Sequence, residues 1–358
     1  MSTDFIQLNK TSLSPEIIKR TVLPKYNLYN AEISIIKFKD TEKQRAVYKV
    51  NYKDKSYCLK KVYYKKDDLL YVYSACEWLY RNNIRVPKLL PTVDFSRFVE
   101  YDDMLFVLSP WVDGIRCSFD NINHVITSIQ KLSEIHSKTR FFKPILGSSL
   151  RQGFDDHYIS TLRHFEDLLK SSNYAFKYRD KFSRQFISSF DSSIKLAEIS
   201  LDFASKINST KLNRSLCHGD YVNKNLIFPK DSNPWIIDLD KCRRDYSMKD
   251  LGYFMRRLLK RENTKWNIPL AMSILKTYNT TSPMTESDFY YVLSYISFPQ
   301  KYWKISRDYY KNIHKCNKSA FLKLLNSSIS RTDTQYEFSI NLVNEINREF
   351  NINLTLNI

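Results

Sequence analysis

The sequence predicts an α+β protein with two lobes, a small strand-rich lobe over residues 1–110 and a larger, mainly helical lobe over residues 111–358. Within residues 31–62, β-branched and aromatic residues form alternating stretches around a polar turn, which is typical of an antiparallel sheet. After Gly114, apolar residues recur at helical spacing over most of the chain. A chain of this length can form two lobes around a cleft. These patterns alone leave other α+β plans open.

The first lobe is expected to begin with a short helix, because Ser14 is a good N-cap and Pro15 suits the first helical turn. Asp67 and Asp68 then open a longer helix with an apolar side. The elements expected in this lobe are the short helix at 14–26, strands within 31–62, the longer helix at 67–83, and strands at 89–95 and 104–110.

The second lobe follows a connection that we place at residues 109–113. Its pattern is helical except for one segment, 216–240, in which strand character returns. The helices expected in this lobe span 122–136, 158–169, 183–206 and several stretches from 249 onward. The strand-like interruption is of interest because polar side chains are concentrated in it.

The composition describes a folded and basic protein. Hydrophobic residues make up 43% of the chain and aromatic residues 15%, which excludes a disordered chain. The net charge of +18 favours polyanionic ligands through its field. The lysines and arginines are scattered, however, so an evenly solvated basic surface explains the charge equally well. No motif supports nucleic-acid binding.

The six cysteines form no C-x-x-C pair and no zinc-finger spacing, so we expect reduced core residues and no structural metal. The first ten residues contain no apolar signal core. No run approaches the roughly eighteen apolar residues that a membrane span requires. The sequence therefore predicts a cytoplasmic protein with no membrane partner.

Three oxygen-bearing side chains in the interrupting segment point to phosphate chemistry. Asp220 lies in a loop that leads into a predicted strand, Asn225 lies five positions later at the start of that strand, and Asp238 ends the next apolar run. Phosphoryl transfer needs a carboxylate near the acceptor hydroxyl and hard oxygen ligands for Mg²⁺. A buried carboxylate with no cation beside it would be costly.

Each of these residues has a simpler interpretation when it is taken alone. A His-Gly-Asp tripeptide is often only a turn, and Asn225 could cap the start of a strand. Asp238 or Asp240 could belong to a structural ion pair. The order and spacing of the whole set, with strand pattern on both sides, favour a catalytic site.

The segment His218-Gly-Asp-x₄-Asn225, followed by Ile237-Asp-Leu-Asp240, resembles the Brenner-type catalytic segment of aminoglycoside phosphotransferases, choline kinases and related small-molecule kinases. The chain is more similar still to the CotS-type spore-coat kinase-like proteins, and the similarity runs through nearly its whole length. The stretches that carry this closer resemblance are 106–114, 132–136, 245–257 and 298–305. The resemblance implies the bilobal protein-kinase-like fold and the use of ATP and Mg²⁺.

The resemblance also implies roles for the residues of the catalytic segment. Asp220 would be the catalytic base, or the acid that orients the hydroxyl, and His218 would support its loop. Asn225 and Asp238 would bind Mg²⁺. Asp240 would lie close by, in a role that could be structural.

In the first lobe, the resemblance implies that Lys60 grips the α- and β-phosphates and that Glu77 holds this lysine. Lys61 is the rival for the phosphate role, but it shares a strand face with Leu59, and the family pattern favours Lys60. Glu77 could instead be a solvated helix charge.

The adenine is implied to dock on backbone groups of the hinge residues Ser109, Trp111 and Val112. No glycine-rich loop occurs between the first two strands, where residues 37–44 lie. Glycine permits the close backbone approach to phosphates that protein kinases use. This departure argues against a protein kinase more than against ATP binding, and it leaves the turnover rate open.

The function predicted from these features is MgATP-dependent phosphorylation of a hydroxyl on a small-molecule or sugar-type acceptor, in the setting of the bacterial spore coat. The alternative is a spore-coat scaffold that keeps the kinase fold with weak or no catalysis, with other coat proteins as its partners. A protein kinase that acts on coat proteins is a third reading. The sequence identifies neither the acceptor nor the oligomeric state.

Overall fold

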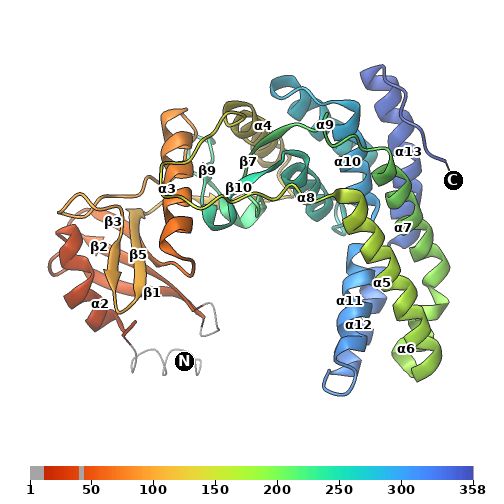
Figure 1. Ribbon diagram of the computed structural model, residues 1–358, viewed down its shortest axis with the longest axis horizontal. Coiled ribbons are helices and arrows are strands. Elements are labelled where there is room, and N and C mark those ends of the chain that lie inside the picture. The colour runs from red at the N-terminus through yellow and green to blue at the C-terminus, as the bar shows by residue number, and fades with distance from the viewer. Residues whose placement is uncertain (1–11, 40–43, 358) are drawn as a thin grey trace. The chain divides into compact units, whose positions relative to one another are not determined.

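The computed structural model describes residues 12–39 and 44–357, which form two compact units (Figure 1). The first unit comprises the chain through Cys117 together with Lys138–Gln152 and Asn223–Cys242. The second comprises Ser118–Ser137, Gly153–Val222 and Arg243–Ile358. The predicted lobe boundary after residue 110 therefore falls inside the first unit. Residues 111–117 and two later segments belong to this unit as well.

The first unit is built on a five-stranded antiparallel sheet with the order β1-β2-β3-β5-β4. Its strands are β1 (Glu32–Lys39), β2 (Arg45–Tyr52), β3 (Lys55–Lys61), β4 (Val99–Tyr101) and β5 (Met104–Pro110). The meander expected within residues 31–62 is confirmed by β1, β2 and β3. The segment 37–44, discussed above for its lack of glycine, lies partly outside the described residues.

One face of this sheet is covered by helix α2 (Pro15–Thr21) and the 3₁₀ helix η1 (Leu23–Tyr26). Ala46, Tyr48 and Val50 alternate along β2 and are fully buried in this core. The Tyr48 hydroxyl donates to the carbonyl of Leu13 at 2.6 Å, which satisfies its polar group. One face of the sheet is therefore packed against this core, and side chains on its other face can contribute to a site.

Helix α3 (Lys66–Arg81) follows β3 and begins close to the predicted position. The expected strand at 89–95 was wrong, because this segment makes only a single bridge, between Leu90 and Leu108. Pro91 directly after Leu90 has no N–H group to continue a ladder. The edge strand beside β5 is β4 instead.

A small β layer completes the first unit. It consists of β6 (Ile115–Arg116), β8 (Leu226–Phe228) and β9 (Trp235–Ile236), flanked by the 3₁₀ helices η2 (Asn223–Asn225) and η3 (Leu239–Lys241). Gly114 precedes β6, and a Cβ there would lie 2.5 Å from the carbonyl oxygen of Phe228, so only glycine fits.

The second unit is mainly helical, with a two-stranded antiparallel ladder of β7 (Arg214–Cys217) and β10 (Arg243–Tyr246). Its helices are α4 (Ile122–Lys138), α5 (His157–Tyr178), α6 (Lys181–Ser188), α7 (Phe190–Ser205), α8 (Met248–Leu259), α9 (Ile268–Thr281), α10 (Glu286–Ser297), α11 (Gln300–Lys311), α12 (Lys318–Ile329) and α13 (Thr332–Phe350). The single helix expected at 183–206 is two helices, since the chain bends at Ser189.

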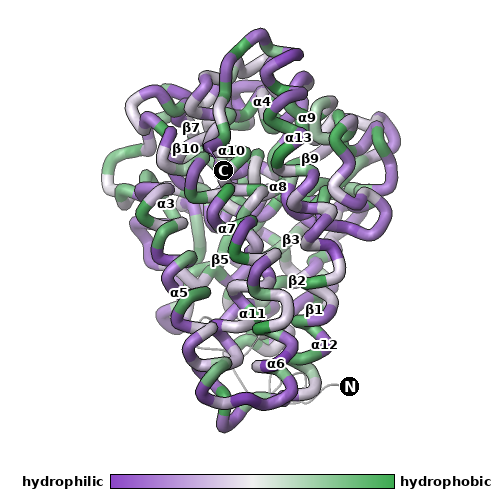
Figure 2. The backbone as a smooth tube through the Cα atoms, turned by 90° about the vertical axis from the view of Figure 1, so that its right-hand side faces the viewer, coloured by the Kyte–Doolittle hydropathy of each residue, from purple (hydrophilic) through white to green (hydrophobic). Residues whose placement is uncertain are grey.

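Helix α10 is buried on nearly all sides and packs against α7, α8 and α13. Helix α7, which packs against it, has one buried face, and green and purple stretches accordingly alternate along α7 in Figure 2. In the described part of the chain, no helix is long and apolar enough to cross a membrane. The predicted α+β class is confirmed.

Candidate active site

The first unit brings Lys60 together with two carboxylates. Leu59 on β3 is buried in the sheet core, so Lys60 lies on the opposite face. Its Nζ atom is 2.7 Å from Asp238 Oδ1 and 2.7 Å from Asp240 Oδ2. Burial lowers the pKa of Lys60, but the charges of Asp240 and Asp238 and their hydrogen bonds outweigh it and raise that pKa above its ordinary value. Lys60 is therefore a fixed cation at neutral pH.

The two carboxylates differ in exposure. The side chain of Asp240 is 8% exposed and that of Asp238 is 37% exposed. The Tyr64 hydroxyl donates to Asp240 Oδ1 at 3.3 Å, and Arg151 donates to the Asp240 carbonyl at 2.7 Å. Asp240 is thus fixed by its surroundings, while Asp238 is the more accessible to a ligand from solvent.

Asp238 has a left-handed backbone, with φ of 65° and ψ of 57°. Aspartate tolerates this conformation better than most residues, at a cost of about 1–2 kcal/mol. The turn directs the chain from β9 into η3. Asp238 therefore does not have the backbone conformation of a residue in a regular strand.

Asn225 is placed beside Asp238 by the β8–β9 hairpin. Leu226 pairs with Ile236, and the Ile237 amide donates to the carbonyl of Asn225 at 3.0 Å. Asn225 is buried and lies directly before β8. The hairpin therefore brings an amide oxygen and a carboxylate to the same end of two paired strands. Carboxylate and amide oxygens are ligands that suit Mg²⁺, so the side chains of Asn225 and Asp238 fit this ion.

Glu77 does not make the ion pair with Lys60 that was predicted for it. Its carboxylate is 3.8 Å from Nε of Arg81 and 3.9 Å from Nζ of Lys88, while Lys60 pairs with the two aspartates. The physical reason is competition, since two carboxylates at 2.7 Å satisfy the lysine. Glu77 is nonetheless only 14% exposed, on the same helix as the buried Cys76.

The predicted hinge residues lie at the end of β5. Ser109 is buried and pairs with Cys58 of β3. The Trp111 amide donates to the carbonyl of Ser56 at 2.9 Å, so this N–H group is already engaged. Val112 follows it and is partly buried. An adenine at this segment would therefore use backbone groups other than the Trp111 N–H.

The second unit holds the loop that carries Asp220. The Asp220 amide donates to Nδ1 of His218 at 3.2 Å, so the ring fixes the backbone of its own loop. Both residues are buried, with Asp220 7% exposed. The hydroxyl of Tyr253 on α8 lies 3.4 Å from Asp220 Oδ1. Asp220 is thus a buried carboxylate with a phenol beside it, which suits an acid–base role.

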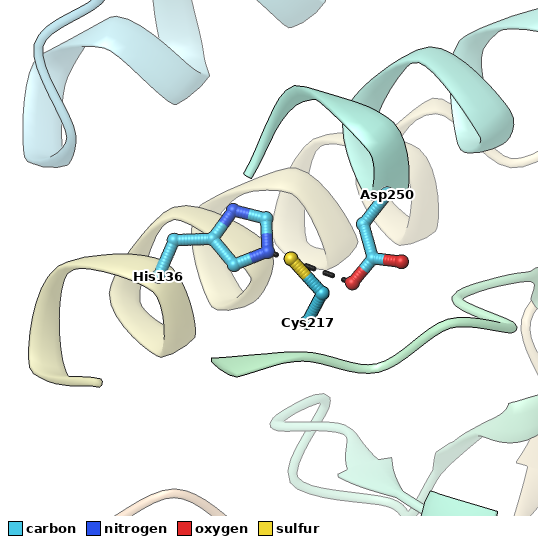
Figure 3. A group of neighbouring side chains, drawn as sticks. All are labelled: His136, Cys217 and Asp250. Atoms are coloured by element: carbon cyan, nitrogen blue, oxygen red, sulfur yellow. Dashed lines mark ion pairs between the residues drawn. The ribbon is translucent and has the colours of Figure 1, made fainter. Parts of the chain in front are cut away.

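Asp250, which had no predicted role, anchors the same loop. Its Oδ2 accepts the His218 amide at 2.6 Å, and its Oδ1 accepts the Gly219 amide at 3.0 Å. Its Oδ2 also lies 3.6 Å from Nε2 of His136 on α4 (Figure 3). Burial opposes ionisation of Asp250, but the bond and charge of His136, then the charge and amide of His218, outweigh it and lower its pKa.

A signal for Asp250 was present in the sequence. The residue lies in the first turn of α8, where an acid is favourable, and in the stretch 245–257 that carried the spore-coat resemblance. A first-turn acid has many explanations, however, and only the three-dimensional structure shows that its two oxygens reach backbone groups more than thirty residues earlier.

His136, Cys217 and Asp250 lie close enough to hold a metal ion, with one ligand atom from each all within 4.8 Å of one another (Figure 3). Burial raises the pKa of Cys217 well above its ordinary value, so the residue is a thiol, and its sulfur lies 3.5 Å from the carbonyl of Tyr246. The Nδ1 atom of His136 bonds the Tyr278 hydroxyl at 2.6 Å. The group is better described as a hydrogen-bonded support of the catalytic loop.

Gly219 offers a direct test of this loop. Its φ is 73°, so Gly219→Ala is expected to cost about 1–2 kcal/mol of stability and to displace Asp220. Gly147→Ala is the matched control, because Gly147 has φ of 83° and lies outside the loop. Urea denaturation should show similar losses for both variants, whereas catalysis should fall only in Gly219→Ala. Equal activity of the two variants would contradict the role of the loop.

A protein-family model described as "Spore coat putative kinase YutH" matches residues 30–341. Solved structures of low sequence identity share the fold. An aminoglycoside phosphotransferase from Alicyclobacillus acidocaldarius subsp. acidocaldarius DSM 446 aligns with a TM-score of 0.77 at 18% identity, over 95% of this chain and 99% of that one.

Two further structures were solved with ligands. Spectinomycin phosphotransferase APH(9)-Ia, in complex with ADP and spectinomycin, gives a TM-score of 0.62 at 16% identity, over 91% and 99% of the two chains. Amicoumacin kinase hAmiN, in complex with AMP-PNP, Ca²⁺ and Ami, gives a TM-score of 0.59 at 12% identity, over 95% and 96% of the two chains. These likenesses confirm the predicted kinase-like fold, which the chain shares with small-molecule phosphotransferases.

Proposed function

Because the chain belongs to the spore coat YutH kinase family, we propose that it is an ATP-dependent phosphotransferase that acts on a hydroxyl of a small-molecule or sugar-type acceptor. The observation that carries the proposal is the ammonium of Lys60, held at 2.7 Å from both carboxylates of the Ile-Asp-Leu-Asp segment. A lysine at this place could bind phosphate oxygens, and Asn225 and Asp238 could hold Mg²⁺, whose charge would offset that of the phosphates.

In the proposed reaction, Asp220 accepts the proton of the acceptor hydroxyl. The hydroxyl oxygen forms a bond to the γ-phosphorus of ATP, and the bond from that phosphorus to the β–γ bridging oxygen breaks. ADP leaves with the electron pair, and the proton passes from Asp220 to solvent. Nucleotide use is supported by the ADP and AMP-PNP in the two ligand-bound relatives. The family description supports the spore coat as the setting that we propose for this activity.

The proposal is tested by nucleotide binding and turnover. The melting temperature should rise with MgATP concentration, because a ligand that binds the folded state stabilises it. ADP should form when candidate alcohols are added. A flat melting temperature, together with no magnesium-dependent ADP formation, would contradict the proposal.

Replacing Lys60 with methionine is expected to weaken MgATP binding at least tenfold. A hydrogen bond to a charged group contributes about 1.5–3 kcal/mol, and methionine removes the ammonium while keeping much of the volume. Lys61→Met is the matched control, because Lys61 is adjacent on β3 and bonds the carbonyl of Gln44 instead. Titration calorimetry with MgATP measures both dissociation constants. Equal constants for the two variants would exclude the phosphate role of Lys60.

A second candidate function is a spore-coat scaffold with a kinase fold. The family description and the net charge of +18 favour it, since a basic surface could bind acidic coat components. A scaffold has no need for a polar set such as Lys60, Asp238 and Asp240 at 2.7 Å. The scaffold predicts that Asp220→Asn assembles like the wild-type protein and that neither form responds to MgATP.

A further inference from the structure

The second unit contains a cavity of about 330 Å³ with a strongly basic wall. It lies between α8, the start of α11 and the connection from α12 to α13. Neither Asp nor Glu is found among the described residues that line it. The cations of its wall are Arg256, Arg257, Lys260, Lys301, Lys304 and Arg331.

These cations are poorly neutralised by the protein. Among the ion pairs of the described residues, Arg331 is the one member of the six that has a partner, Glu262. Burial, together with the charges of Lys301, Arg257 and Arg256, lowers the pKa of Lys260 to about 8. Positive charges gathered in a partly enclosed space create a field that favours an anion.

Helix α11 adds to this field. Its N-terminus lines the cavity, and its first turn has no acidic residue. Lys301 lies in that first turn and Lys304 lies one turn further along. The N-terminal end of a helix carries a partial positive charge, so cations are normally unfavourable there and anions favourable. An anion bound in the cavity would offset the positive charges of the two lysines and the partial positive charge of the helix end.

The cavity adjoins the catalytic loop through Tyr253. Its ring is part of the cavity wall, and its hydroxyl lies 3.4 Å from Oδ1 of Asp220. The guanidinium of Arg257 lies over the same ring, 5.6 Å from its centroid. One side chain therefore touches both the basic wall and the carboxylate that would take the proton of the acceptor.

We propose that this cavity holds the charged end of the acceptor, and that the acceptor is a small hydroxylated anion carrying a carboxylate or phosphate group. The proposal rests on the phosphotransferase function given above. The hydroxyl would reach Asp220 past Tyr253 while the oxyanion lies among the cations of α8 and α11. A volume of about 330 Å³ matches a small molecule and not a polymer. A protonated amine would be repelled by the same wall.

The experiment compares glucose with three of its derivatives, which have the same six-membered ring and differ in charge. Glucose is neutral, glucosamine is a cation, and glucuronate and glucose 6-phosphate are anions with different oxyanions. Binding to the full-length chain is measured by calorimetry without nucleotide, so the result does not depend on catalysis. We expect at least tenfold tighter binding of one or both anions than of glucose, and the weakest binding for glucosamine. Equal binding of all four, or a preference for glucosamine, would overturn the proposal.

Charge-reversal variants locate the site. Lys301 and Lys304 are exposed, so the double variant Lys301→Glu/Lys304→Glu should fold, and it should weaken anion binding at least tenfold, or about 1.4 kcal/mol. Lys311→Glu is the control at the other end of α11, where the side chain is also exposed. It should bind the anions like the wild-type protein. Equal weakening in Lys311→Glu would show a general charge effect and overturn the site.

The same proteins separate this proposal from the phosphotransferase function. If MgATP binds but anions show no preference, the acceptor class is wrong and the function stands. If anions bind in the cavity but MgATP does not bind, the phosphotransferase function fails and the cavity is an anion site alone, which overturns the acceptor role. A single-stranded oligonucleotide serves as a polymeric anion. If it displaces glucose 6-phosphate at a lower concentration than glucuronate does, a small-molecule site is excluded.

Discussion

Asp220→Asn is expected to reduce phosphoryl transfer by about 10²- to 10⁴-fold, because proton transfer by a positioned carboxylate contributes a factor of that size. Asparagine has nearly the same shape but cannot accept the proton of the acceptor hydroxyl. The residue lies in the loop of the second unit, whereas Lys60, Asn225 and Asp238 belong to the first. Binding of MgATP should therefore change little while turnover is lost.

The control for this variant is Asp191→Asn, an exposed carboxylate in the first turn of α7. It removes the same charge from the protein and should retain full activity. Single-turnover measurements of ADP formation distinguish chemistry from product release. If Asp220→Asn transferred phosphate at the wild-type rate, Asp220 could not be the base, and another group would have to be sought in the loop.

Asp250→Ala is expected to lower the free energy of unfolding by about 3–5 kcal/mol, the cost of removing one partner from a buried charged network. The change would leave the amides of His218 and Gly219 buried without their acceptor. It would also remove the carboxylate that faces His136. Asp191→Ala, another first-turn acid but an exposed one, should cost less than about 1 kcal/mol.

The same carboxylate predicts a pH dependence. The pKa of Asp250 is lowered in the folded state from an ordinary value of 3.8. In the window below that value the unfolded chain binds more protons, so the stabilisation is complete above it and is lost as the pH falls through the folded pKa. Other aspartates also titrate there, so we compare the wild-type protein with Asp250→Asn. Urea denaturation should show a shallower loss below pH 4 in the variant; parallel curves would contradict the assignment.

The part of the site that depends on local pattern could be predicted from the sequence. Strand alternation correctly indicated that Lys60 and Leu59 face opposite ways. The apolar runs after Asn225 and before Asp238 indicated two strands, and their pairing brings these residues to one end of a hairpin. For Lys60, a period of two residues determines the direction of the side chain.

The remaining features depend on contacts between residues that are far apart in the chain, and a single sequence does not reveal which of these residues meet. The partner of Lys60 was expected on the following helix, at Glu77, but it is provided by two aspartates about 180 residues away in the chain. Asp250 reaches a loop more than thirty residues before it. Such contacts are decided by tertiary packing, and competing partners of similar chemistry cannot be ranked by spacing.

The failed prediction of a strand at 89–95 has a different cause. The residues have strand-like side chains, but Pro91 has no backbone N–H group to donate to a neighbouring strand. Only a single bridge forms, at Leu90. The break within 183–206 is similar, since periodicity continues through Ser189 while the backbone direction changes there. The amphipathic pattern of a helix or strand indicates which of its faces is buried, but it is less informative about the residue at which the element ends.

The two contacts of Lys60 have a consequence for the order in which ligands can enter. With its ammonium between Asp238 and Asp240, the lysine is a resident counterion that cancels one of their two negative charges. A free divalent cation arriving alone would be repelled by that ammonium. A nucleotide arriving with its cation offers phosphate oxygens to the lysine and a new positive charge to the carboxylates. The site should therefore show low affinity for the bare metal ion and exchange its ionic partners in a single step when nucleotide and metal ion bind together.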